Sequence, residues 1–368
     1  MKYYIIAGEA SGDLHGSNLI KELKKKDTAA NIRCWGGDLM QQAGGDLVKH
    51  YRDLAFMGFT EVLMNLPTIL RNLKFCKEDI LSFKPDAIIL IDYPGFNLRI
   101  AKWAKEQGIK VIYYISPQVW AWKEGRVKMM KECIDKMLVI LPFEKDYFKN
   151  KWNWEVEYVG HPLVEVVESE MIKVKSENSS DKKNIALLPG SRKQEILKKL
   201  PIMLEVSKSF PGYQFVIAKG SAVDDSFYNE LIKPYPNVSS VRNETYNLLL
   251  ESKAALVTSG TATLETALFD VPEVVCYKGS SISYQIAKRL IKVKYISLVN
   301  LIMDKPVVKE LIQDELTPEN LKHELQELLS NEERIKQVKK DYSDLKTLLS
   351  QGGHASEKAA SSIFNFLS

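Results

Sequence analysis

Short apolar runs alternate with amphipathic stretches along most of the chain. In the first half, runs typical of buried strands occupy residues 3–7, 32–35, 87–91, 111–115 and 137–140, with helical patterns such as 67–83 and 97–107 between them. A second series has expected strands at 185–188, 215–218, 238–241, 254–258 and 274–277. Strands that alternate with helices indicate parallel sheets. The pattern therefore predicts an α/β chain with two Rossmann-like, doubly wound domains that face a cleft.

Changes in composition suggest where these domains end. Residues 169–183 are rich in Ser, Lys, Glu and Asn and are expected to form a polar linker. Residues 318–368 have a helical pattern that breaks at Gly352 and Gly353. We expect an N-terminal domain (1–170), a second domain (171–345) and a helical segment (346–368). That segment is expected to pack back on the N-terminal domain of its own chain or of a partner chain.

The overall composition excludes several classes of protein. The 368 residues are 45% hydrophobic and 27% charged, which suits two folded cores. Because 51 basic residues balance 47 acidic ones, the net charge of +4 does not indicate a nucleic-acid partner. The four cysteines are far apart and form no C-x-x-C pair, so zinc and disulfides are not expected. The N-terminal apolar segment is too short for a signal peptide, which predicts a cytoplasmic chain with at most peripheral membrane contact.

The first expected strand runs into a glycine-containing stretch that we call the N-terminal turn (residues 8–16). Glycine allows a ligand to approach the backbone closely, and the N-terminus of a helix favours anions. The spacing matches neither the dinucleotide fingerprint nor the phosphate loop. The turn either binds substrate or is only a tight connection from strand to helix. Its candidate ligand-binding residues are Gly8, Ser11, Gly12, Asp13 and Gly16.

Two further stretches in the first half follow expected strands, where a wound sheet binds its ligands. Asp92 comes directly after five consecutive apolar residues and is either a general base in a cleft or a turn aspartate. Trp120 and Trp122 lie in a polar turn. They could stack on a sugar or line an acyl pocket, or they could pack in the core.

Two stretches in the second half have the composition of a phosphate site. In the Arg192 turn (residues 189–192), backbone N–H groups precede an arginine whose planar guanidinium suits phosphate, although a surface arginine is the alternative. The Ser259 turn (residues 258–262) and the residues after it could form a nest for a phosphate, with Glu265 on a ribose diol, although Ser and Thr also cap helices. The candidate binding residues are Gly190, Ser191, Arg192, Ser259, Gly260, Thr261, Ala262, Thr263 and Glu265.

Residues 54–70 are more apolar than a solvent-facing helix requires, and Arg71, Lys74 and Lys77 follow them. Such a segment either lies in a membrane surface or is a buried helix. The expected acyl or membrane patch consists of Met57, Phe59, Val62, Leu63, Leu66 and Leu70.

Together the candidate residues indicate a nucleotide diphosphate bound by the second domain and a second substrate on the first. The chain has no Asp-x-Asp sequence that could hold a metal against the diphosphate, so we expect no metal and no cofactor. Arg192 and two helix N-termini would stabilise the charge instead.

Six stretches in the same order resemble the lipid-A-disaccharide synthase family over nearly the whole chain. They are residues 8–13 (GEASGD), 116–122 (SPQVWAW), 141–144 (LPFE), 160–162 (GHP), 188–192 (LPGSR) and 259–265 (SGTATLE).

The resemblance implies a GT-B glycosyltransferase at the inner membrane of a Gram-negative bacterium. The family joins UDP-2,3-diacylglucosamine to 2,3-diacylglucosamine 1-phosphate (lipid X), giving the β-1,6-linked lipid A disaccharide 1-phosphate and UDP. The reaction inverts the anomeric centre and needs no metal, and some members dimerise by exchanging C-terminal segments.

Matched to the family's pattern, Asp92 is the expected catalytic base and Arg192 the diphosphate-binding arginine, which is also treated as catalytic. Asn300 matches an asparagine near the nucleotide sugar. Many members have a second acid three residues after Asp92, where this chain has Gly95, and many have Ser where Gln118 stands. The first difference places more weight on Asp92, and the second suggests that the acceptor side differs in detail.

Three other classes remain as alternatives. A nucleotide-sugar epimerase would share the scaffold and the UDP site but would need no acceptor. A non-catalytic sugar-binding protein would have the cleft without the chemistry. A dinucleotide dehydrogenase is the weakest alternative, because its fingerprint is missing.

Overall fold

The computed structural model describes residues 1–53, 66–173, 182–220, 223–280, 284 and 293–368. The chain divides into two compact units. Unit 1 contains residues 1–162 and 349–368, and unit 2 contains residues 163–348. The division falls near the expected boundaries after residues 170 and 345. Each unit is described separately below.

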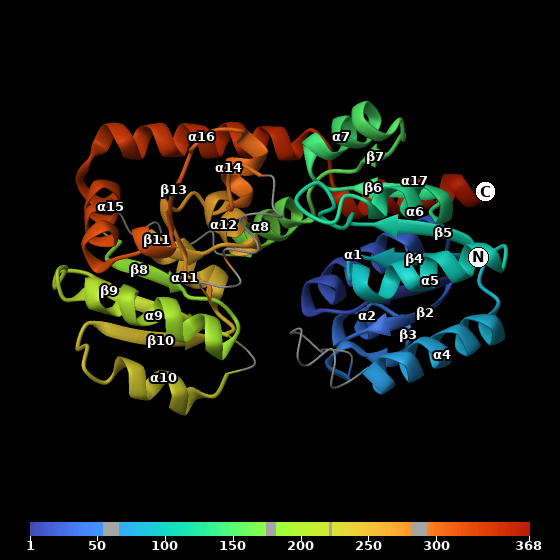
Figure 1. The fold of residues 1–368 in the computed structure, drawn as a ribbon, viewed down its shortest axis with the longest axis horizontal. Helices are drawn as coiled ribbons and strands as arrows, with labels where there is room; N and C mark the ends of the chain where they lie inside the picture. Colours follow the sequence, from blue (N-terminus) through green and yellow to red (C-terminus); the bar gives the residue numbers. More distant parts are fainter. Residues whose placement is uncertain (54–65, 174–181, 221–222, 281–283, 285–292) are drawn as a thin grey trace. The chain divides into compact units, whose positions relative to one another are not determined.

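Unit 1 is built on a seven-stranded parallel sheet with the order β3-β2-β1-β4-β5-β6-β7 (Figure 1). The order reverses direction at β1 and β4, which pair directly, so the switch point lies between them. The strands are β1 (Lys2–Ala7), β2 (Asn31–Gly36), β3 (Asp46–His50), β4 (Ala87–Ile91), β5 (Lys110–Tyr114), β6 (Lys136–Val139) and β7 (Glu157–Tyr158).

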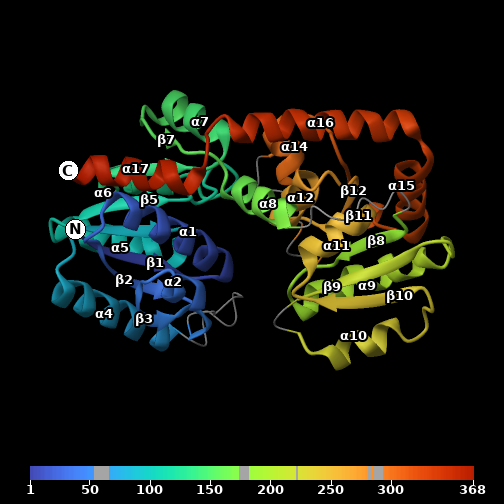
Figure 2. The ribbon, with the colours of Figure 1, turned by 180° about the vertical axis from the view of Figure 1, so that it is seen from behind.

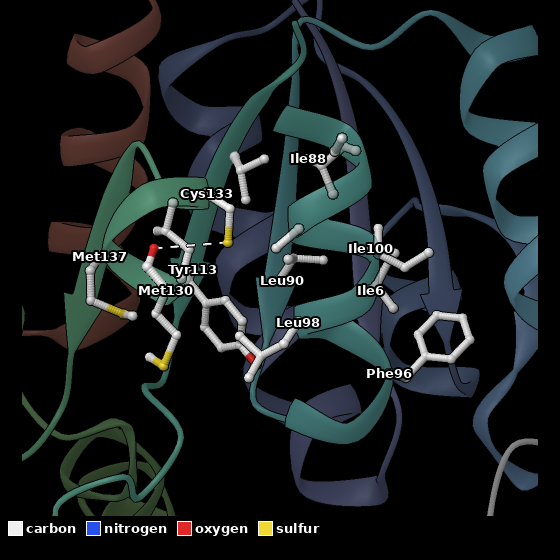
Figure 3. Packing of buried hydrophobic residues seen from close by; sticks show 14 of the residues in the cluster. Ile6, Ile88, Leu90, Phe96, Leu98, Ile100, Tyr113, Met130, Cys133 and Met137 are labelled. Carbon is white, nitrogen blue, oxygen red and sulfur yellow. Dashed lines mark hydrogen bonds between the residues drawn. The ribbon is translucent and has the colours of Figure 1, made fainter. Parts of the chain in front are cut away.

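Helices cover both faces of this sheet. On one face, α4, α5, α6 and α7 contribute apolar side chains to a shared core with alternate residues of the strands. Figure 3 shows part of this core, where Ile6, Ile88 and Leu90 of the strands pack with helical residues such as Phe96 and Met130. The helices of this unit are α1 (Ala10–Lys26), α2 (Asp38–Gln42), α4 (Leu66–Phe83), α5 (Pro94–Glu106), α6 (Arg126–Cys133), α7 (Pro142–Trp152) and α17 (Ala355–Leu367), with a 3-10 turn at Tyr51–Asp53.

The opposite face is covered by α1 and by the last helix of the chain. Ala359, Ala360 and Ile363 of α17 are buried against Leu19 and Ile20 of α1. Figure 2 shows α17 in red within the N-terminal half of the fold. Where the chain returns to unit 1, the backbone at Gly352 passes very close to the backbone at Gly160. A Cβ on Gly352 would lie 2.3 Å from the Cα of Gly160. The two glycines allow this crossing.

Unit 2 has a six-stranded parallel sheet with the order β10-β9-β8-β11-β12-β13. Helices α9, α10 and α15 share one apolar core with the strands, whereas α11 and α12 contact the strands without joining that core. The strands are β8 (Asn184–Leu188), β9 (Gln214–Lys219), β10 (Val238–Arg242), β11 (Ser252–Thr258), β12 (Glu273–Tyr277) and β13 (Lys309–Ile312). The helices are α8 (Pro162–Lys173), α9 (Lys193–Ser207), α10 (Asp225–Ile232), α11 (Thr245–Glu251), α12 (Thr261–Leu268), α14 (Leu298–Met303), α15 (Pro318–Ser330) and α16 (Glu332–Ser350), with a 3-10 turn at Gln313–Glu315.

The predicted fold class is confirmed, with two wound parallel sheets and a helical C-terminus. The interpretation of residues 169–183 as a linker is partly wrong, because α8 continues to Lys173. Apolar side chains at helical spacing in its first turns, including Leu163 and Val167, are buried. Within the described part of the chain, no helix is long and apolar enough to cross a bilayer.

Candidate functional site

A cavity of about 310 Å³ lies at the carboxyl ends of the strands of unit 2. Strands β8 and β11 are neighbours in the sheet, so the turns that follow them meet at one edge. Residues of the Arg192 turn and of the Ser259 turn both contribute to its wall. The cavity is lined by Leu188, Gly190, Ser191, Glu195, Ala218, Lys219, Gly220, Thr245, Thr258, Ser259, Gly260, Thr261, Ala262 and Glu265.

Two glycines, one in the Arg192 turn and one directly after β9, allow this turn to adopt its position. Gly190 has φ +114°, a conformation that favours glycine, and a Cβ there would lie 3.0 Å from the Glu195 carboxylate. Gly220, after β9, would bring a Cβ to 3.0 Å from the Cα of Ser191. The turn is therefore held close to the neighbouring strand end, and its backbone faces the cavity.

The Ser259 turn is held in place by side-chain hydrogen bonds. Gly260 has φ +139° and precedes α12. The Ser259 hydroxyl donates to the carbonyl of Ile296 (2.8 Å), and the Thr263 hydroxyl donates to the carbonyl of Gly260 (2.9 Å). These bonds hold the turn so that Gly260, Thr261 and Ala262 line the cavity at the N-terminus of α12, where an anion is favoured.

Glu265, one turn into α12, also lines this cavity. Burial raises the pKa of its carboxyl group, and a hydrogen bond with Tyr246 partly opposes that rise. A carboxylate at this depth can accept hydrogen bonds from a diol.

Arg192, at the end of its turn, has a side chain that is 57% exposed and is not among the residues that line the cavity. Its Nη1 donates to Glu195 Oε1 at 3.1 Å. Such an exposed pair is weak, so the guanidinium can exchange the carboxylate for a phosphate at small cost.

Two predicted binding residues are buried and do not line the cavity. Thr263 supports the Ser259 turn through the bond described above. The Asn300 amide donates to Val308 O and Glu310 Oε1 and accepts from Val308 N, at 2.9 to 3.0 Å. In this structure both side chains therefore support the local fold.

In unit 1, Asp92 lies at the carboxyl end of β4, next to the switch point between β1 and β4. Asp92 and Tyr93 have φ values of +44° and +48°, an uncommon conformation that tends to occur at functional sites. The Asp92 carbonyl accepts from Tyr113 Oη (2.6 Å) and Asn97 Nδ2 (2.8 Å), which hold the strained backbone. The turn is thus fixed from two neighbouring elements.

Burial raises the pKa of Asp92 to about 6, and the charge of Glu9 contributes to the rise. A carboxylate with this pKa is a stronger base than a solvated aspartate and is still ionised at neutral pH. Glu9 was not among the predicted site residues. Only the fold brings it close to Asp92, since 82 positions separate them in the sequence.

Most of the N-terminal turn has a packing role. A Cβ on Gly8 would lie 2.3 Å from the ring of Tyr93, and one on Gly16 would lie 2.6 Å from the Met40 sulfur. The Asp13 carboxylate is buried and accepts from the backbone N–H groups of Gly37 (2.7 Å), Met40 (3.0 Å) and Leu39 (3.1 Å), so it caps α2. Gly12 packs on Ala7, and Ser11 is the one candidate residue of this turn that is exposed. The structure therefore does not favour Gly12, Asp13 and Gly16 as residues that contact a ligand directly.

The two tryptophans of residues 116–123 have different surroundings. The Trp120 indole donates to Glu144 Oε1 (3.2 Å), and the other oxygen of that carboxylate accepts from Leu141 N (3.0 Å). Burial raises the pKa of Glu144 to about 7. Trp122 is 47% exposed, with the Lys123 ammonium 4.1 Å from its ring centroid. Trp120 is therefore a packed residue, whereas Trp122 is available to a ligand.

The predicted acyl or membrane patch lies almost wholly outside the described residues. Met57, Phe59, Val62 and Leu63 are not described, nor is the side chain of Leu66. Leu70 on α4 is 56% exposed.

Solved structures with the same fold define the class of this protein. The UDP-GlcNAc 2-epimerase of Neisseria meningitidis, determined bound to UDP-GlcNAc, matches with a TM-score of 0.70 and 14% identity over 99% of this chain and 100% of that one. The glycotransferase of kitacinnamycin matches with a TM-score of 0.68 and 16% identity over 100% and 99%. Together with the two wound sheets, these likenesses assign the chain to the GT-B fold.

The chain belongs to the lipid-A-disaccharide synthetase family, whose model matches residues 3–364. The lipid-A-disaccharide synthase of Syntrophus aciditrophicus is 40% identical over 97% of this chain and 95% of that protein. The synthase of Geobacter metallireducens is 37% identical over 99% and 96%. The chain is accordingly a glycosyltransferase of lipid A biosynthesis, and the resemblance found in its sequence is confirmed.

Proposed function

We propose that this enzyme transfers 2,3-diacylglucosamine from UDP to the 6-hydroxyl of 2,3-diacylglucosamine 1-phosphate. The products are the β-1,6-linked disaccharide 1-phosphate and UDP, with inversion at the anomeric carbon. The family sets the reaction class. The observation that carries the donor assignment is the cavity of unit 2, in which two strand-to-helix turns and Glu265 surround a space suited to a nucleoside diphosphate.

The donor orientation follows from the chemistry of the cavity walls. Backbone N–H groups at the N-terminus of α12 and in the Arg192 turn suit the diphosphate, and Glu265 suits the ribose hydroxyls. Arg192 releases Glu195 and binds the diphosphate through its planar guanidinium. When the sugar–phosphate bond breaks, these groups stabilise the negative charge on departing UDP by a few kcal/mol each in a closed site.

Asp92 is the proposed base for the acceptor. Its carboxylate takes the proton of the 6-hydroxyl as that oxygen bonds to the anomeric carbon and UDP leaves from the opposite face. The raised pKa near 6 supports this role, because it brings the base closer to the operating pH. Gly95 provides no second carboxylate beside it.

We also propose that the enzyme acts at the cytoplasmic surface of the inner membrane, where lipid substrates are held. On α4, exposed Leu70 and Leu81 accompany exposed Arg71 and Lys74, a combination typical of a peripheral membrane helix. Replacing Met57, Phe59 and Leu63 with serine should release a folded protein from anionic liposomes in a flotation assay. Continued flotation would favour the buried-helix alternative.

The deciding experiment is product detection by mass spectrometry after incubation with UDP-2,3-diacylglucosamine in EDTA, with and without 2,3-diacylglucosamine 1-phosphate. We expect a disaccharide phosphate and UDP only when both lipids are present. Conversion of the UDP-sugar without the acceptor would instead support an epimerase, the activity named for several proteins that share this fold. UDP binding without either product would leave a transferase with another acceptor.

A further inference from the structure

A second cavity of about 290 Å³ lies beside the first in unit 2. Glu195, Thr258 and Ser259 line both cavities and form a common wall. The remaining residues that line the second cavity come from α9 and from the end of β12 and the residues after it. They are Gln194, Lys198, Lys199, Tyr277, Lys278, Gly279 and Ser280. The proposed donor site does not use these seven residues.

The lining of the second cavity is strongly cationic. The lining contains three lysines and one carboxylate, that of Glu195, which already pairs with Arg192. The lysines are Lys198, Lys199 and Lys278. The remaining side chains include a phenol, a hydroxyl and a carboxamide, all of which can donate hydrogen bonds. This lining suits an oxygen-rich anion and does not suit an acyl chain.

Lys199 shows that the cationic character extends into the protein interior. Its side chain is only 3% exposed, and its ammonium donates to the Thr258 hydroxyl at the base of the Ser259 turn. Burial lowers the pKa of this lysine. A buried ammonium with a partial set of partners is stabilised when an anion occupies the space beside it.

A further donor lies behind the cavity wall at Gly279. A Cβ on Gly279 would lie 3.4 Å from the Tyr277 hydroxyl and 3.6 Å from Gln313 Nε2. Gln313 Oε1 accepts from Gly279 N (3.2 Å), but its Nε2 is buried and has no hydrogen-bond partner among the described residues. A buried donor of this kind usually has a partner in the functional state.

We propose that the second cavity binds a phosphate monoester, the 1-phosphate of the acceptor lipid. This assignment rests on the proposed function, because that reaction has one substrate with a phosphomonoester. The shared wall places this anion beside the diphosphate end of the donor cavity, with cations on both sides of the wall to limit repulsion between the two groups. Lys278 is the main specificity residue, since it is half-buried and has no assigned part in the donor site.

The proposal is tested by titration calorimetry of the UDP-saturated protein with glucosamine 1-phosphate, and with glucosamine, which lacks the phosphate, as the control. Lys278→Gln should weaken binding of the phosphomonoester about tenfold, the change expected when one charge-assisted hydrogen bond is lost. Lys309→Gln is the matched control, because Lys309 is exposed at the start of β13 and lines neither cavity. In the full reaction, Lys278→Gln should raise KM for the acceptor about tenfold while KM for the UDP-sugar stays within twofold.

Four results would overturn the proposal: no binding of glucosamine 1-phosphate by the wild-type protein, equal binding of glucosamine, equal binding by Lys278→Gln, or a tenfold loss of UDP affinity in that variant. The last result would assign the cavity to the donor diphosphate. Failure of the proposed function has a different signature, because phosphomonoester binding would persist without disaccharide formation.

Discussion

The N-terminal turn and the Arg192 turn occupy equivalent places in their units, yet the fold uses them differently. Each follows the first strand of a wound sheet and leads into a helix. In the N-terminal turn, the Asp13 carboxylate accepts hydrogen bonds from three backbone N–H groups, and neighbouring side chains pack directly on the glycines. In the Arg192 turn, Gly190 and Ser191 line a cavity. Glycine thus serves close packing in one turn and lines a cavity in the other.

The largest effect should come from removing the Asp13 carboxylate. Asp13→Ala leaves three backbone N–H groups of residues 37–40 without their acceptor in a buried site, so the free energy of unfolding should fall by about 3 kcal/mol or more. Urea unfolding measures this loss. The exposed Ser11→Ala, in the same turn, should change it by less than about 0.5 kcal/mol. If Asp13→Ala kept full stability and lost UDP binding, the N-terminal turn would be a ligand site after all.

Asp92 should show the largest effect on turnover. Asp92→Asn should lower kcat at least about a hundredfold, the usual contribution of a general base, with little change in UDP affinity. For the wild type, kcat/KM should fall about tenfold per pH unit below pH 6, because the carboxyl group with its pKa near 6 must lose its proton to act as a base. Glu106→Gln, an exposed acid at the end of α5, is the control. A flat profile from pH 5 to 7 would exclude Asp92 as the base.

Much of the fold could be predicted from the sequence because buried parallel strands are continuous apolar runs. The five apolar residues from Ala87 to Ile91 coincide with β4. The edge strands β3 (Asp46–His50) and β13 (Lys309–Ile312) were not predicted, because they are short and carry polar side chains that are partly exposed. Such strands are defined by their pairing with β2 and β12 and not by their own pattern.

The lining of the candidate site was predictable where it consists of strand-to-helix turns. Gly190, Ser191 and Ser259 to Ala262 all line the cavity, as strand-to-helix turns should in a wound sheet. The side chains whose partners lie on other elements of the fold could not be assigned in this way. Asn300 bonds to Val308 and Glu310, and Glu9 influences Asp92, only because the fold brings them together.

Arg192→Ala tests the ligand role of the second turn. UDP affinity should fall about tenfold, or about 1.5 kcal/mol, the lower end of the range for hydrogen bonds to charged groups because this arginine is exposed. Stability should not change measurably, in contrast to Asp13→Ala. Lys193→Ala removes the same charge from the adjacent exposed position and should leave UDP affinity within twofold. Calorimetry with UDP would contradict the assignment if both variants behaved alike.

The smallest effect, and the most specific to this turn, should come from Glu195. Its carboxylate accepts from Arg192 at 3.1 Å and lines the donor cavity, so it competes with the diphosphate for the guanidinium and repels the bound anion. Exposed ion pairs are worth about 0.2 to 1 kcal/mol, so Glu195→Gln should raise UDP affinity by about two- to threefold, and less at high salt. Calorimetry at two ionic strengths measures both changes. If the competition for Arg192 dominates, the gain should vanish in the Arg192→Ala background. A loss of affinity in Glu195→Gln would show that the carboxylate supports the turn, as Asp13 supports its own.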